Sequence, residues 1–208
     1  MERTTTYRSI SVPSAAWAGG LSVVALLINL TILSLHHLFS PKDFLFLWLG
    51  VLAVAASANT ILLYRDSLRT GCSFPSPAML SALRGMIPAF FAAGIFTGLF
   101  TFQEIYSKVL YHWDVIEVPV WMLFYGLALL GTQYFAPRSI VIMGWAFLIS
   151  ALVLVTMLPT LNFFLAGKNP SGPYEWLASV LMASTFGGFH LIYSVAVHIS
   201  LRRQGGTP

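Results

Sequence analysis

Six apolar stretches, each about 18–24 residues long, follow one another along the chain and constrain its fold more than any other feature. A helix of about 20 residues crosses the hydrocarbon core of a bilayer, because each residue adds about 1.5 Å along the axis. Strands of a membrane barrel would alternate in polarity over about 10 residues, and these stretches do not alternate. The sequence therefore predicts an all-α integral membrane bundle of six transmembrane helices. The spans cover 15–36, 44–64, 85–102, 116–136, 139–160 and 176–199.

The scarcity of charged residues agrees with a lipid environment. Of 208 residues, 57% are hydrophobic and 9% are charged, whereas about 25% are charged in a soluble domain. So little polar surface cannot cover a globule in water. We expect one transmembrane domain over 1–208, in contact with the lipid bilayer. The basic residues are dispersed between the spans, which argues against nucleic acid as a partner.

The positions of the basic residues predict an orientation. With the N-terminus in the cytoplasm, only Lys42, Lys108 and Lys168 fall outside, and five acidic residues, among them Glu117, fall there too. The positive-inside rule favours this arrangement. It predicts a multi-pass protein of the cell inner membrane with both termini cytoplasmic. The cytoplasmic basic residues are Arg3, Arg8, Arg65, Arg69, Arg84, Arg138, Arg202 and Arg203.

Three connections between spans have distinct sequence signals. In the 65–84 segment, Ser76 and Pro77 read as the N-cap and first residue of a helix, so the third helix should begin there. In 103–115, apolar residues recur at helical spacing with tyrosines nearby, which predicts a short helix lying in the outer interface; they are Ile105, Val109 and Trp113, with Tyr106 and Tyr111. The 161–175 loop carries turn residues. The single cysteine, Cys72, excludes an intrachain disulfide and reads as a reduced thiol without a catalytic role.

His190 is the first candidate for a ligand-binding residue, because ionisable side chains are rare inside a span and often functional. The structural alternative is a neutral ring bonded to a group on a neighbouring helix. Tyr125, near the middle of the fourth span, is the first candidate for that partner, because its hydroxyl also needs one. A haem held by two histidines would need a second histidine level with His190, and His36, His37, His112 and His198 lie at other depths.

Other residues read as structural. Small residues that let helix backbones approach closely recur in the spans: Gly85, Ala89 and Ala93, then Gly94 with Gly98, and Gly187 with Gly188. Arg138 follows Pro137 at the start of the fifth span, where it anchors to lipid phosphate or caps the helix. Pro88 is expected to kink the third helix.

The sequence carries no motif for nucleotide binding, zinc or serine-hydrolase chemistry. We therefore predict no catalytic residues, no metal site and no cofactor. The leading hypothesis is a non-enzymatic sensor or accessory or regulatory subunit of a membrane complex, with other membrane subunits as partners. A carrier or binder of a small apolar ligand or cofactor within the bundle is the alternative. An enzyme acting on lipid ranks third.

A family resemblance covers the part of the chain from Pro119 onward, and the first half agrees with it in hydropathy alone. This part resembles a group of small uncharacterised bacterial multi-pass membrane proteins, some of which are encoded beside a winged-helix regulator. The resemblance implies a bacterial inner-membrane location and a regulatory setting, and it supplies no chemistry. The residues that carry it are Pro119, Trp121, Met122, Leu123, Tyr125, Gly126, Ala128, Gly131, Phe135, Arg138, Met143, Gly144, Phe147, Phe186, Gly187, Gly188 and His190.

Overall fold

The computed structural model describes residues 16–31, 41–71, 73–106, 113–134, 136–166 and 175–205, and the regular structure among them is helical throughout. Each predicted stretch contains one helix, which confirms the all-α fold. The first helix covers Ala16–Thr31. The others are α2 (Pro41–Thr70), α3 (Pro77–Tyr106), α4 (Trp113–Gly131), α5 (Arg138–Ala166), and a last helix composed of α6 (Glu175–Met182), the π-helical turn η1 (Ala183–Gly187) and α7 (Gly188–Gly205).

Four of the helices are long and apolar enough to cross a membrane. These candidate spans are Asp43–Arg69, Met79–Phe102, Arg138–Leu158 and Leu177–Ser200. Two further helices, Ala16–Thr31 and Val115–Gly131, are apolar but shorter. Large apolar side chains on the outside of the bundle, such as Phe91 and Ile142, are 70% and 68% exposed, as expected where a surface meets lipid.

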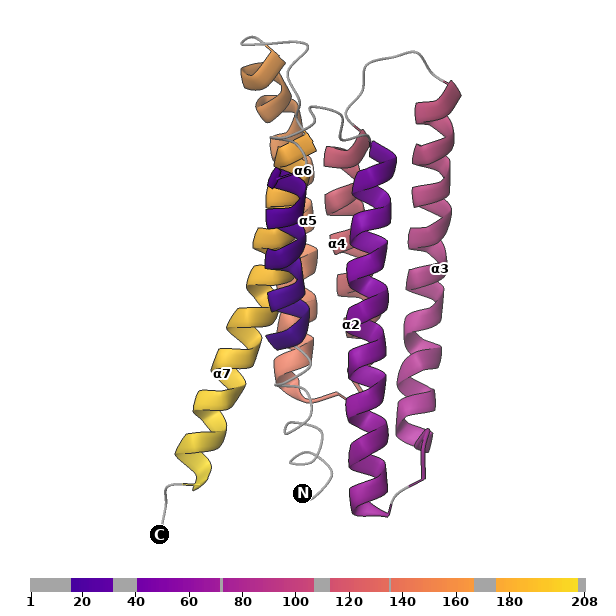
Figure 1. The fold of residues 1–208 in the computed structure, drawn as a ribbon, viewed down its shortest axis with the longest axis vertical. Coiled ribbons are helices and arrows are strands. Elements are labelled where there is room, and N and C mark those ends of the chain that lie inside the picture. Colours follow the sequence, from indigo (N-terminus) through magenta and orange to yellow (C-terminus); the bar gives the residue numbers. More distant parts are fainter. Residues whose placement is uncertain are drawn as a thin grey trace.

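Consecutive helices run in opposite directions along the bundle (Figure 1). The first helix runs upward from about mid-height in this view, and α7 ends at the lower end. The turn between α2 and α3 and the link between α4 and α5 lie at the same end. We call it the arginine end, because Arg69 and Arg138 lie at the helix ends there.

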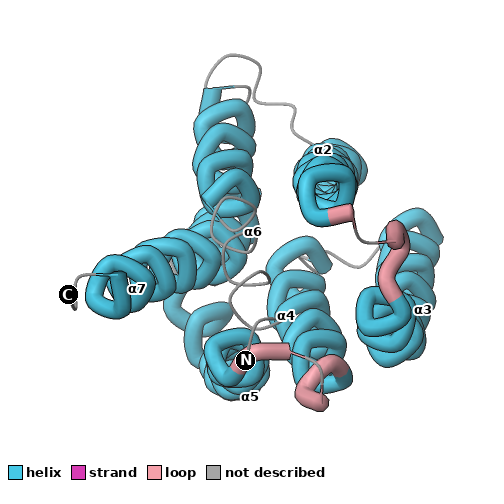
Figure 2. The backbone as a smooth tube through the Cα atoms, turned by 90° about the horizontal axis from the view of Figure 1, so that it is seen from below, coloured by secondary structure: helices cyan, strands magenta, loops and turns pink. Residues whose placement is uncertain are grey.

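The helix α4 lies in the middle of the bundle and contacts α2, α3, α5 and α6 (Figure 2). Two glycine pairs bring its neighbours close. A Cβ added to Gly85 of α3 would lie 2.7 Å from the carbonyl oxygen of Gly131, and one added to Gly126 would lie 2.8 Å from the carbonyl oxygen of Gly144 in α5. Any side chain at these positions would push the backbones apart.

The connection between α2 and α3 is shorter than the predicted 65–84 loop. The helix α2 continues to Thr70, and Gly71 ends it with a left-handed φ of 66°, which glycine adopts without strain. The predicted start of α3 is confirmed, because the Met79 amide donates to Ser76 Oγ at 3.2 Å. The true connection is therefore 71–76.

The predicted interfacial helix at 103–115 is corrected at both of its ends. Residues 103–106 form the last turn of α3 and residues 113–115 the first turn of α4, since the apolar pattern of each span continues into them. Between them, 107–112 lie outside the described residues, as do Cys72 and 167–174 of the predicted loop 161–175. Residues 161–166 belong to α5.

Candidate ligand-binding site

His190 and Tyr125 meet in the interior of the bundle. The Tyr125 hydroxyl lies 2.9 Å from His190 Nε2, and His190 is 9% exposed. The two residues come from α4 and α7, helices that run in the same direction in Figure 1. The predicted hydrogen bond across the bundle is confirmed.

The other ring nitrogen fixes the roles of the two groups. His190 Nδ1 lies 2.6 Å from the carbonyl oxygen of Phe186. Because a carbonyl oxygen can only accept, Nδ1 carries the proton and donates it. In the neutral ring Nε2 is then the acceptor, and the Tyr125 hydroxyl donates to it. Both nitrogens of His190 are thus engaged within the protein.

Aromatic rings surround this pair. The fully buried ring of Phe147 meets Tyr125 edge-on at 4.9 Å between centroids and lies 6.0 Å from His190. Phe186 lies 5.3 Å from Tyr125, and Phe189 meets Phe147 edge-on at 5.0 Å. Edge-to-face contacts of this kind stabilise a core beyond their buried area. Together with Phe147, the pair forms a packed contact that joins α4, α5 and α7, and we call these three residues the brace.

The role expected of Gly187 and Gly188 needs a correction. Gly187 does allow a close approach, but it faces the first helix, where an added Cβ would lie 2.9 Å from Ser22 Cβ. Gly188 has nothing within 4 Å of such a Cβ among the described residues. The contact between His190 and Tyr125 therefore owes nothing to Gly188.

The π-helical turn just before His190 is a feature that the sequence analysis missed. It covers Ala183–Gly187, and the Thr185 hydroxyl donates to the carbonyl oxygen of Leu181 at 2.6 Å. A π-helical turn inside an α-helix often occurs at a functional site. Here it shifts the face that α7 presents relative to α6, so His190 and Phe189 point toward α4 and α5 while Ser179 points toward the first helix.

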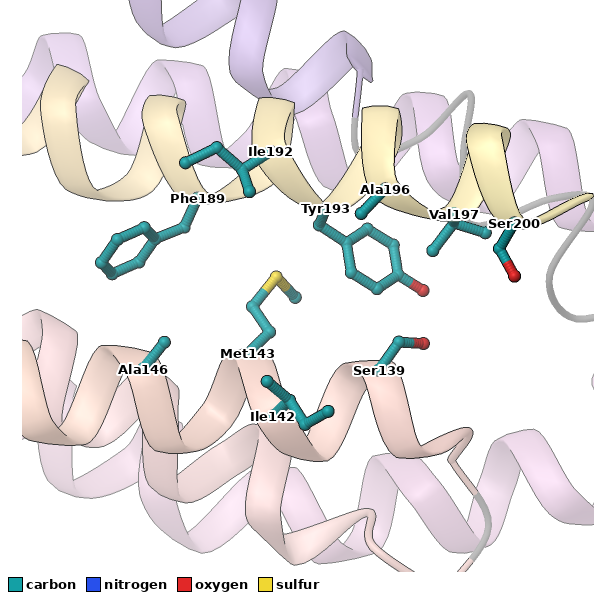
Figure 3. Close-up of a pocket in the computed structure, with 10 residues that line it drawn as sticks. All are labelled: Ser139, Ile142, Met143, Ala146, Phe189, Ile192, Tyr193, Ala196, Val197 and Ser200. Atoms are coloured by element: carbon teal, nitrogen blue, oxygen red, sulfur yellow. The ribbon is translucent and has the colours of Figure 1, made fainter.

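Beside the brace, α5 and α7 enclose a groove of about 310 Å³ (Figure 3). Most of its lining is apolar, and Phe189 belongs both to the groove and to the aromatic core. Its rim is open, because Ile142 and Ile192 are 68% and 65% exposed. The lining residues are Ser139, Ile142, Met143, Ala146, Phe189, Ile192, Tyr193, Ala196, Val197 and Ser200.

One end of the groove is polar. The hydroxyl groups of Ser139, Tyr193 and Ser200 gather at the arginine end, whereas Phe189 and Ala146 line the other end (Figure 3). Within the described part of the chain, the buried Ser139 Oγ has no hydrogen-bond partner. Arg138, the residue before it, is exposed at the start of α5. The groove thus combines an apolar slot with a polar, positively charged mouth.

A second buried polar contact, also missed from the sequence, lies near the opposite end. Asn29 of the first helix donates through Nδ2 to Ser179 Oγ of α6 at 2.5 Å, and both residues are fully buried. Asn29 Oδ1 has no partner among the described residues. An asparagine within an apolar run was the available signal, since its amide must find a partner there.

Two further expectations are corrected. Glu117, assigned to the outside segment, is 5% exposed and lies between the buried residues Val115 and Val118 of α4, because the helix begins one turn earlier, at Trp113. Gly94 and Gly98, expected to bring helices together, have nothing within 4 Å of an added Cβ among the described residues. That face of α3 is on the outside of the bundle.

No protein-family model, curated protein or solved structure matches the chain. The resemblance of the part from Pro119 onward to bacterial membrane proteins therefore stays a prediction. The geometry of the bundle alone carries the functional proposal.

Proposed function

We propose that this chain is a non-enzymatic multi-pass membrane protein that binds a small, mostly apolar ligand in the groove between α5 and α7. The groove is the observation that carries the proposal. Its volume of about 310 Å³ falls at the lower end of the range for ligand sites, which are typically apolar with a few polar groups. Its open rim faces the surface that meets lipid, so a ligand dissolved in the bilayer can enter sideways.

The environment of His190 supports a role in joining the helices beside the groove. Both ring nitrogens are engaged, one by Tyr125 and one by the Phe186 carbonyl. In this proposal the contact between His190 and Tyr125 holds α7 in place beside the groove.

The topology belongs to the same proposal. Arg65, Arg69, Arg84 and Arg138 lie at or near the arginine end, at which α7 also terminates. By the positive-inside rule this end faces the cytoplasm. Six crossings then place both termini in the cytoplasm, with a bacterial inner membrane as the predicted location.

The proposed role in the cell is that of a sensor or accessory subunit. Support for a partner comes from α3, on which Gly94 and Gly98 face outward beside exposed Phe91 and Leu99. A transmembrane helix of a partner subunit could approach closely there. Gly98→Leu should lower recovery of co-purified membrane subunits, whereas Gly20→Leu, equally open in the first helix, should not. Equal recovery of co-purified membrane subunits from both variants would contradict the proposed role as a subunit.

The binding proposal is tested by photolabelling. Membranes that contain the full chain are irradiated with a diazirine fatty acid, and the labelled peptides are identified by mass spectrometry. We expect label on Ile142–Ala146 and Phe189–Ala196. Ala196→Trp places an indole in the groove from an exposed position and should remove most of this label. Ala53→Trp, on the exposed face of α2, is the matched control.

Label spread evenly over all helices, or unchanged in Ala196→Trp, would exclude the groove as a binding site.

A further inference from the structure

We propose that the occupant of the groove is a phospholipid with an anionic headgroup. One acyl chain lies between α5 and α7, and the phosphate lies at the mouth formed by Arg138 and Ser139. This inference rests on the proposed function and specifies the ligand of the same groove. Four observations carry it: the length of the groove, its polar end, a buried hydroxyl without a partner, and the charge of the two helices.

The length of the groove matches one leaflet. Along α7 the lining extends from Phe189 to Ser200, which corresponds to about 16 Å at about 1.5 Å per residue. Half of a hydrocarbon core is about 15 Å thick. The groove begins at the arginine end, where the helices leave the membrane. A slot of this length and position suits an extended acyl chain better than a compact molecule.

The polar end lies where the headgroup of such a lipid would lie. Ser139, Tyr193 and Ser200 bring their hydroxyls together there (Figure 3). Ser139 Oγ is buried and has no partner in the described part of the chain. Leaving a buried hydroxyl unbonded is unfavourable. With the Ser139 side chain turned toward the mouth of the groove, a phosphate or ester oxygen there would accept its proton.

The charged residues of the two helices that line the groove are all basic. Neither α5 nor α7 contains an aspartate or a glutamate. Arg138 begins α5, and Arg202 and Arg203 lie in the last turns of α7, just beyond Ser200. Basic residues next to a membrane-embedded site favour anionic headgroups, and each contributes about 1 kcal/mol near the surface.

The test measures which lipid the protein retains. The full chain is reconstituted in vesicles of equal phosphatidylglycerol and phosphatidylcholine, extracted in mild detergent and analysed by native mass spectrometry. We expect phosphatidylglycerol to be retained preferentially. Arg138→Gln should lower its retention about fivefold, the factor that corresponds to about 1 kcal/mol, and should leave phosphatidylcholine unchanged. The preference should also shrink as salt rises.

Matched variants separate the possible outcomes. Arg84→Gln removes an exposed arginine of α3 near the same end and should leave retention unchanged. Ser139→Ala should weaken retention of both lipids, because its hydroxyl meets oxygens that both share. Circular dichroism confirms that each variant is folded.

The outcomes distinguish failure of the anionic headgroup from failure of ligand binding in the groove. Equal retention of the two lipids, or an equal loss in Arg84→Gln and Arg138→Gln, would overturn the anionic headgroup and leave ligand binding in the groove intact. If Ala196→Trp retains as much of each lipid as the unmodified chain, both this inference and the proposed function are wrong.

Discussion

The imidazole of His190 shows how one polar ring is accommodated deep in an apolar bundle. Its two nitrogens bond to Tyr125 and to the Phe186 carbonyl, and aromatic rings surround it. Hydrogen bonds between membrane helices are worth about 0.6–1.7 kcal/mol. The pair therefore stabilises the packing of α4 against α7 by a modest amount, and its value to the protein is mainly orientation.

A double-mutant cycle measures this bond. His190→Phe removes the ring nitrogen that accepts from the Tyr125 hydroxyl, and Tyr125→Phe removes the hydroxyl that donates to Nε2. We expect each single variant to lower the free energy of unfolding by about 1–2 kcal/mol. The double variant should lose less than the sum, with a coupling near 1 kcal/mol. Unfolding in mixed micelles gives these values, and strict additivity would show that the pair does not interact.

The contact between Asn29 and Ser179 leads to an asymmetric prediction. Ser179→Ala removes the acceptor of the fully buried Asn29 amide. It should therefore destabilise the protein by about 1–3 kcal/mol. Adding Asn29→Leu removes the stranded amide with little change in volume, so the double variant should regain most of that loss. Thermal unfolding in detergent is the measurement. A double variant less stable than Ser179→Ala would contradict the asymmetry.

At this scale the sequence predicted His190 and Tyr125 because an imidazole and a phenol stand out in apolar runs. Asn29, Ser179 and Ser139 were missed for a physical reason. Small polar side chains also satisfy themselves on their own helix, as Thr60 does by donating to the Ala56 carbonyl. Which of them face another helix depends on helix rotation, and hydropathy does not reveal rotation.

At the scale of elements, glycine has two different roles in the bundle. Gly85 and Gly131 place α3 and α4 in backbone contact, whereas Gly94 and Gly98 meet nothing among the described residues. Four-residue spacing singled out Gly85 as well as Gly94 and Gly98, because such a repeat marks a smooth helix face without showing whether that face meets a neighbouring helix. The structure distinguishes the two faces of α3.

This difference gives a matched pair of substitutions in one helix. Gly85→Ala places a Cβ 2.7 Å from a backbone oxygen that cannot move aside alone, so we expect a loss of about 1–3 kcal/mol. Gly94→Ala meets open space and should be neutral or slightly stabilising, because alanine favours helix. Unfolding midpoints of the two purified variants measure both effects. Equal effects would mean that α3 and α4 are not in close contact.

Helix boundaries were predicted best where local chemistry fixes them. Ser76 and Pro77 mark the start of α3 through a side-chain cap, and that prediction is confirmed. The end of α2 was placed six residues too early, at 64 instead of Thr70, because polar helix residues look like a loop in a hydropathy profile. The π-helical turn joins α6, which contacts α2 and α4, to α7, which contacts α5, and these tertiary contacts cannot be read from local sequence.

At the scale of the whole molecule, hydropathy sufficed for the order of the helices that the structure describes, because each apolar stretch is long enough to form one helix. It could not place Glu117 inside the bundle or reveal the groove. Both depend on which helices are neighbours, and α4 is central because glycines on two of its faces admit α3 and α5.

The proposed topology is tested with reporter fusions. A fusion after Gly205 should report the cytoplasm, and one inserted at Asn169 should report the opposite side, because five crossings precede that position in the proposed arrangement. Alkaline phosphatase and green fluorescent protein give complementary signals. Both positions reporting the same side would contradict six crossings.

The most direct test of the central claim, a ligand held between α5 and α7, is an experimental structure of the full chain extracted with its native lipids. We predict elongated density in the groove, beginning beside Arg138 and ending near Phe189, next to an intact contact between Tyr125 and His190. A groove closed by direct packing of Met143 and Ala146 against Tyr193 and Ala196, with no density between the helices, would contradict it.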